Sequence, residues 1–158
     1  MLLFDENGYV YPYEIIEVSL TEFERVFIQS MENRDHRQLI FSGYLRFIKD
    51  LKSTLGVSFY QWVNGSFTTN KPFPGDIDVV SFIDYDRFVS KLPQIEHFHA
   101  VAKNLYNTDA HFAAVCKWNH RFHVRSEQDH AYWKEVFGFS RPDENGIKHP
   151  KGILKIQF

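Results

Sequence analysis

The spacing of hydrophobic and polar positions predicts the helices and strands of this chain. Between residues 39 and 55, apolar side chains recur at steps of three and four and form one continuous stripe along a helix. Gly56 follows this stripe directly and favours a helix end, because glycine adopts the left-handed conformation at little cost. We expect this long helix to be core scaffold and not part of a functional site.

Other helices are indicated by capping patterns. Ser19 and Glu22 have capping-box spacing and precede a helix predicted over residues 20–31. Asp84 and Asp86 precede another helical pattern, and helix N-capping explains them more simply than a metal site does. Further helices are predicted over 84–93, 94–105 and 126–137.

Short runs rich in β-branched and aromatic residues indicate strands. They are predicted over 57–63, 76–83, 110–115, 122–125 and 152–158. Together with the helices they predict one α/β (α+β) domain over residues 1–158. We expect a mixed β-sheet with the helices packed mainly on one side.

The composition narrows the class of protein. Of the 158 residues, 44% are hydrophobic and 17% aromatic, which excludes a disordered chain. The formal net charge of −2 gives no overall basic field, so general DNA binding is not expected. Cys116 is the only cysteine, which excludes an intrachain disulfide. The beginning of the chain lacks signal-peptide features and no apolar run is long enough for a membrane span, so we expect a cytoplasmic protein that does not enter membranes.

Asp76 and Asp78 are the first candidates for chemistry. They lie two positions apart at the start of a predicted strand, so both side chains should point to the same face. Two neighbouring carboxylates repel each other unless a positive charge lies between them. Hard oxygen ligands suit Mg²⁺ or Mn²⁺, and the pair therefore predicts a metal site. The alternative is a pair of surface acids at a strand end.

Gly65 and Ser66 form a turn between this strand and the one before it. Backbone amides and the Ser66 hydroxyl in such a turn can receive phosphate oxygens. Lys71, in the following loop, can add a positive charge to the same phosphates. A plain turn is the alternative, but its position beside the Asp pair favours phosphate binding.

These two motifs resemble the signature of a known superfamily. The resemblance rests on Val63-Asn64-Gly65-Ser66 and, nine residues later, Asp76-Ile77-Asp78-Val79-Val80. This pattern is similar to that of the DNA polymerase β-type nucleotidyltransferases and of small bacterial nucleotidyltransferase-like proteins. The resemblance is most specific over residues 63–83 and implies a nucleotidyltransferase fold.

The resemblance implies a function. It implies an Mg²⁺-dependent (or Mn²⁺-dependent) enzyme that transfers a nucleoside monophosphate from an NTP, such as ATP, to an acceptor that is a protein, a tRNA or a small molecule. Asp76 and Asp78 would bind metal, with Asp109 on the next predicted strand as a third ligand or general base. Because small bacterial relatives often belong to toxin–antitoxin or phage-defence pairs, the resemblance also implies a partner protein.

Competing interpretations remain at the level of sequence. The first is a catalytically inactive nucleotide-binding or partner-binding module of the same fold. A metal-dependent nuclease or phosphohydrolase also uses clustered acids, but it needs no triphosphate-binding turn. Zinc binding by Cys116, His120 and His123 matches no strong zinc pattern. His111 lies two residues from Asp109 and is expected on the same strand face.

Overall fold

A five-stranded mixed sheet with the order β3-β7-β4-β5-β6 forms the centre of the protein, in a computed structural model that describes residues 2–158. β4 (Tyr60–Asn64) runs antiparallel to both β5 (Ile77–Asp84) and β7 (Ile153–Gln157). β6 (Thr108–Val115) is parallel to β5, and β3 (Ile15–Glu17) is parallel to β7. The prediction of a mixed sheet in an α+β protein is confirmed.

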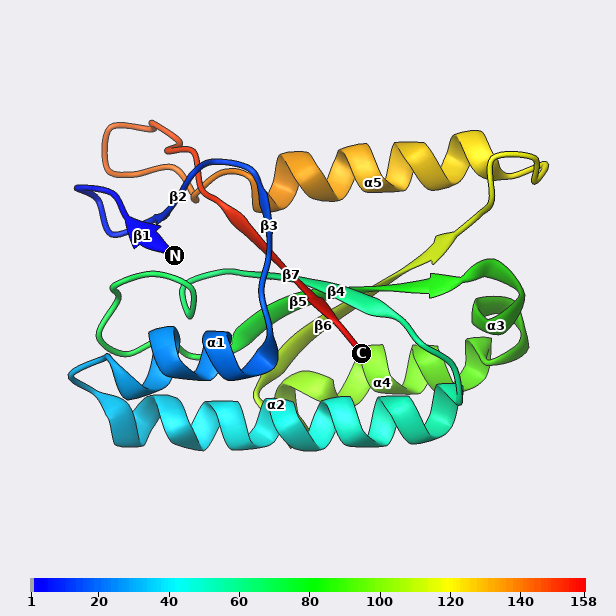
Figure 1. Ribbon diagram of the computed structural model, residues 1–158, viewed down its shortest axis with the longest axis horizontal. Coiled ribbons are helices and arrows are strands. Elements are labelled where there is room, and N and C mark those ends of the chain that lie inside the picture. The colour runs from blue at the N-terminus through cyan, green and yellow to red at the C-terminus, as the bar shows by residue number, and fades with distance from the viewer. Residues whose placement is uncertain (1) are drawn as a thin grey trace.

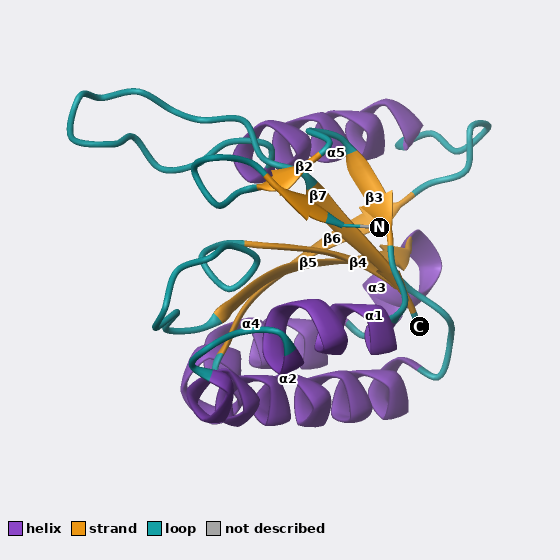
Figure 2. Ribbon diagram, turned by 60° about the vertical axis from the view of Figure 1, so that its left-hand side comes forward, coloured by secondary structure: helices purple, strands orange, loops and turns teal. Residues whose placement is uncertain are grey.

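Helices cover both faces of the sheet, but unequally. α1 (Leu20–Glu24), α2 (Arg34–Leu55) and α4 (Leu92–Tyr106) lie on one face, and α5 (His123–Phe137) lies alone on the other (Figure 1). The same layers separate in the turned view (Figure 2). The prediction that helices pack mainly on one side is thus confirmed, with α5 as the exception.

Three shorter elements and a π-helical turn complete the chain. α3 (Tyr85–Ser90) connects β5 to α4, and the π-helical turn η1 (Arg25–Gln29) follows α1 directly. β1 (Leu3–Phe4) and β2 (Val10–Tyr11) pair as a separate antiparallel ribbon. Within the described residues, none of the helices combines the length and the apolar character that crossing a membrane requires.

The alternation of side chains along β5 shows how the two layers share the sheet. Ile77, Val79 and Ile83 belong to the larger core, which lies between the sheet and the helices α1, η1, α2 and α4. Val80 and Phe82 belong to the smaller core beneath α5. Successive strand residues point to opposite faces of a sheet. The side chain of Asp78, two positions before Val80, therefore also lies on the α5 face.

Several sequence predictions need correction. The strand predicted over 122–125 is wrong, because His123 already begins α5. Ser126 does not open that helix. Its hydroxyl accepts from the Cys116 amide at 3.1 Å and donates to the Ala114 carbonyl at 3.1 Å, which ties α5 to the end of β6. The helix predicted over 20–31 is divided into α1 and η1. The strands β1, β2 and β3 were not predicted, because strands this short leave no periodic pattern in the sequence.

The predicted caps are present. The Ser19 hydroxyl accepts from the Glu22 amide at 3.0 Å, at the start of α1. The Asp84 carboxylate accepts from the amides of Asp86 and Arg87 at the start of α3. This second Asp-x-Asp motif therefore caps a helix, as its position after the strand predicted.

A buried arginine fixes the loop between β4 and β5. Arg37 of α2 is only 1% exposed, and its guanidinium donates to four backbone carbonyls. The acceptors are Phe27 at 3.0 Å, Phe67 at 2.7 Å, Thr69 at 2.9 Å and Lys71 at 2.8 Å. Burial lowers the pKa of Arg37 to about 10, which still leaves it charged at neutral pH. One side chain thus joins α2, η1 and the loop.

We predict that Arg37→Met lowers the free energy of unfolding by at least about 3 kcal/mol, because several buried carbonyls lose their donors. Arg37→Lys keeps a charge but offers fewer donors in a different geometry. Its free energy of unfolding should therefore fall somewhat less than that of Arg37→Met. Urea unfolding measures both, with Arg34→Met at the exposed start of the same helix as the control. Equal losses for Arg37→Met and Arg34→Met would contradict the prediction.

Candidate functional site

Three carboxylates meet on the α5 face of the sheet, where β5 and β6 begin. Asp78 and Asp109 are each the second residue of their strands, and they are register partners across the parallel pair. Asp76 lies directly before β5, so its predicted place within the strand is wrong by one residue. All three side chains nevertheless line one cavity. The structure therefore brings together the three acids that the sequence singled out.

A lysine from α4 lies between two of these acids. The Lys103 ammonium is 2.9 Å from the Asp76 carboxylate and 3.6 Å from that of Asp109. Hydrogen bonding to Asp76 and the charges of both acids raise the pKa of Lys103. Its side chain is 63% exposed, so it reaches the acids from solvent. Sequence reasoning missed this residue, because its helical position carries no motif.

The Asp78 carboxylate is in an unfavourable environment. Burial, and then the negative charges of Asp76 and Asp109, raise its pKa from 3.8 to about 6. The positive charges of Lys151 and Arg141 oppose this shift but do not cancel it. The repulsion between these like charges would be reduced by an added positive charge.

The cavity beside these acids has a volume of about 1020 Å³ and joins distant parts of the chain. Its walls come from the loop after β4, the starts of β5 and β6, the end of α5 and the loop before β7. Five cationic side chains line it: Lys71, Lys103, Arg141, Lys148 and Lys151. The acids thus form one negative corner of a cavity whose remaining lining is mixed, with these cations, one further acid, Glu135, and neutral residues.

Gly65 is required at its position by the approach of Asp78. It has a φ of +85°, and a β-carbon there would lie 1.6 Å from the nearer Asp78 carboxylate oxygen. The Gly65 amide donates to the Asn64 side chain at 2.7 Å, so this predicted phosphate donor is already engaged. Ser66 and Lys71, the other predicted phosphate ligands, line the cavity. The turn therefore makes room for a carboxylate, in addition to any contact with phosphate.

Lys151 is a second residue whose role the sequence did not reveal. It is 6% exposed, and its ammonium donates to the Gly65 carbonyl at 3.2 Å. The ring of Tyr9 lies 5.7 Å from the same ammonium. Burial lowers the pKa of Lys151 to about 8, against the opposing charge of Asp78. A cluster of basic residues before the last strand was the only sequence signal for it.

The histidines contact groups of the protein itself. His123 contacts the Cys116 backbone carbonyl at 3.3 Å, and no group of three His, Cys, Asp or Glu side chains is placed to hold a metal ion within residues 2–158. His111 lies 3.5 Å from the Asp109 carboxylate, on the same face as predicted, and burial lowers its pKa. It packs against Trp133 of α5.

The acid corner has oxygen atoms of the kind that bind a divalent cation, although its three carboxylates are not arranged as a metal-holding group within residues 2–158. Asp76 and Asp109 already hold one positive charge between them, the Lys103 ammonium. Their oxygen atoms are the ligands that Mg²⁺ and Mn²⁺ prefer. In the structure the mostly exposed Lys103 ammonium is the cation beside these acids.

Comparison with known proteins identifies a family but no activity. The sequence profile of a family of unknown function, DUF6932, matches residues 2–157. Searches of curated proteins and of solved structures gave no match.

We predict that Gly65→Ala destabilises the protein more than Gly146→Ala does. Both glycines have positive φ, +85° and +77°, so each variant carries a similar backbone cost of about 1 kcal/mol. Only at Gly65 does the added β-carbon meet Asp78, whereas nothing lies within 4 Å of it at Gly146. We expect about 2 kcal/mol of additional loss at Gly65 in denaturant unfolding. Matching losses would show that Asp78 does not require this glycine.

The raised pKa of Asp78 predicts a stabilising substitution. Because the folded-state pKa of about 6 exceeds the ordinary 3.8, the ionised carboxylate destabilises the fold above pH 6, and this penalty fades as the pH falls through 6. The free energy of unfolding of Asp78→Asn should therefore exceed that of the unsubstituted chain by about 1–3 kcal/mol at pH 7.5, without added metal. At pH 4.5 the difference should largely disappear. A variant less stable at pH 7.5 would rule out the proposed repulsion.

Proposed function

We propose a function for this chain, which belongs to the DUF6932 family: it is a metal-dependent nucleotidyltransferase that moves a nucleoside monophosphate from an NTP to an acceptor. The observation that carries the proposal is the convergence of Asp76, Asp78 and Asp109 at one corner of a cavity that five cationic side chains also line. A ligand with a chain of phosphates and a bound divalent ion matches both parts of this cavity.

The sequence motif supports the same proposal. The turn at Gly65 and Ser66 and the acids at Asp76 and Asp78 belong to antiparallel neighbours, with Asn64 paired to Asp78. Their spacing in the sequence resembles the nucleotidyltransferase signature, and the mixed sheet with α2 and α4 on one face is compatible with that fold. We therefore propose the nucleotidyltransferase fold as the finer description of this α+β protein.

The reaction needs few groups from the protein. An acceptor hydroxyl attacks the α-phosphorus of the NTP, a new oxygen–phosphorus bond forms, the bond to the β-phosphate oxygen breaks, and pyrophosphate leaves. Asp109 is the candidate to take the hydroxyl proton, because its side chain is 35% exposed at the cavity and lies beside His111. Ser66 and Lys71 line the cavity and would orient the phosphates.

The metal ion would have two tasks in this scheme. When bound, Mg²⁺ or Mn²⁺ neutralises charge on the transferring phosphate and favours ionisation of the acceptor hydroxyl. Asp76, Asp78 and Asp109 would hold it.

One observation favours a second candidate function, a nucleotide-binding module without catalysis. The Lys103 ammonium bridges Asp76 and Asp109, so the protein itself supplies a cation to the acid corner. If this contact persists when a nucleotide binds, the phosphates can be held without a catalytic ion.

We predict that an NTP with Mn²⁺ or Mg²⁺ raises the melting temperature and that Asp76→Asn with Asp78→Asn removes this shift, because a ligand stabilises the state that it binds. The matched control is Asp84→Asn with Asp86→Asn. This pair has the same spacing at the other end of β5, and asparagine also caps a helix. An undiminished shift in the first double variant would place the nucleotide elsewhere.

Label transfer distinguishes the enzyme from the binding module. The chain is incubated with cell lysate, Mg²⁺ and each α-labelled NTP in turn. The nucleotidyltransferase predicts label on a macromolecule or small molecule, lost in the Asp76 and Asp78 double variant. Nucleotide binding without any transfer of label would favour the module.

A further inference from the structure

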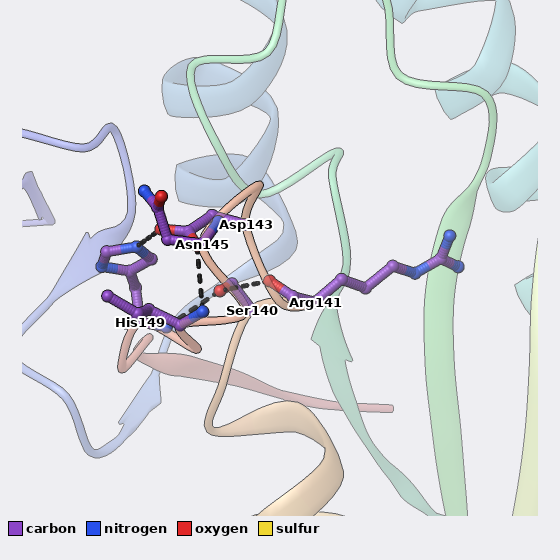
Figure 3. A network of polar contacts seen from close by, with 6 residues as sticks. Ser140, Arg141, Asp143, Asn145 and His149 are labelled. Carbon is purple, nitrogen blue, oxygen red and sulfur yellow. Dashed lines mark hydrogen bonds and ion pairs between the residues drawn. The ribbon is translucent and has the colours of Figure 1, made fainter.

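The segment between α5 and β7 is an internally braced loop over residues 139–150. Its ends are joined by the Ser140 amide donating to the His149 carbonyl at 2.8 Å and the His149 amide donating to the Ser140 hydroxyl at 2.9 Å. At its tip, one Asp143 oxygen accepts from the amides of Asn145 and Ile147, and the other contacts the His149 ring at 3.0 Å. Figure 3 shows this network. The loop is thereby held in a defined shape although most of it is exposed.

Arg141 belongs to this loop but takes no part in bracing it through its side chain. The Ser140 hydroxyl donates to its backbone carbonyl at 2.8 Å, which fixes the backbone at this residue. Its side chain extends away from the network (Figure 3) and lines the cavity that contains Asp78. Among residues 2–158, no carboxylate forms an ion pair with this guanidinium.

Two of the other four cations of the cavity are already engaged by the protein. Lys103 is paired with Asp76 and Asp109, and Lys151 is buried against the Gly65 carbonyl. The Gly65 amide is occupied by Asn64, so the turn supplies one donor fewer than its sequence suggested. Arg141 therefore offers a donor fork in the same cavity as the acid corner, and a planar guanidinium binds phosphate oxygens in pairs.

We propose that the braced loop presents Arg141 as a clamp for the terminal phosphates of the ligand, so that the site selects polyphosphates. This inference rests on the proposed function, since the α-phosphate end is assigned to the acid corner. The bracing holds the Arg141 backbone in place before binding, which lowers the entropy cost of gripping the phosphates.

Binding of inorganic tripolyphosphate to the full chain tests the clamp without requiring the preferred base to be known. In the presence of Mn²⁺, Arg141→Ala should weaken tripolyphosphate binding roughly tenfold to a hundredfold, the usual effect of losing a charge-assisted hydrogen-bonded pair. Arg141→Lys should recover only part of this loss, because lysine lacks the fork. Calorimetric titration measures each affinity.

The control is Arg121→Ala, which removes an exposed arginine from the loop at the opposite end of α5 (Figure 1). It should bind tripolyphosphate within about twofold of the unsubstituted chain, since a rim charge outside the site contributes little. Mn²⁺ binding, followed by electron paramagnetic resonance, should be equal in all these variants.

Asp143→Ala should weaken tripolyphosphate binding several-fold by loosening the loop. Unchanged binding in that variant would show that bracing is unnecessary and would overturn that part of the proposal.

The possible results separate the clamp from the proposed function. Equal tripolyphosphate affinities for Arg141→Ala and Arg121→Ala overturn the clamp and leave the metal site standing. Binding that needs Arg141 but not Mn²⁺ supports the clamp and contradicts the metal-dependent function. If the unsubstituted chain does not bind tripolyphosphate at all, both proposals fail.

Discussion

The buried guanidinium of Arg37 is the constraint on which the rest of the site depends. A charge with 1% exposure is costly to bury unless its donors are satisfied, and here four backbone carbonyls satisfy them. Three of these carbonyls belong to the loop between β4 and β5. The loop that carries Lys71 and leads to Asp76 is therefore held against α2 by an interaction inside the core.

The acid corner is built against an electrostatic cost. Asp78 is buried beside Asp76 and Asp109, and its pKa of about 6 expresses that cost. Gly65 leaves the space that the Asp78 carboxylate occupies, and Lys103 supplies a nearby positive charge. Stability alone would favour fewer carboxylates at this place. Clusters that reduce stability in this way are typical of functional sites, which supports a binding or catalytic role.

The two ends of the cavity are held in place by different interactions. Asp78 and Asp109 lie on β5 and β6, where the hydrogen-bonded register fixes them, and Asp76 directly precedes β5. Arg141 and Lys148 lie on an exposed loop whose shape depends on the contacts of Asp143 and Ser140. Acids fixed on the sheet and a separately braced loop are the arrangement that the proposed clamp requires.

Local pattern determined much of this protein. The stripe of α2, the caps at Ser19 and Asp84, the main strands and the shared face of Asp109 and His111 all follow from spacing within a few residues. Only the tertiary structure decided the contacts between distant segments: Arg37 with its loop, Lys103 between two acids, and Lys151 with Gly65. Ser126, which looked like the start of a helix, joins β6 to α5 instead. Spacing along a chain fixes which face a side chain takes, whereas its partners across the fold depend on the packing of whole elements, which no local pattern records.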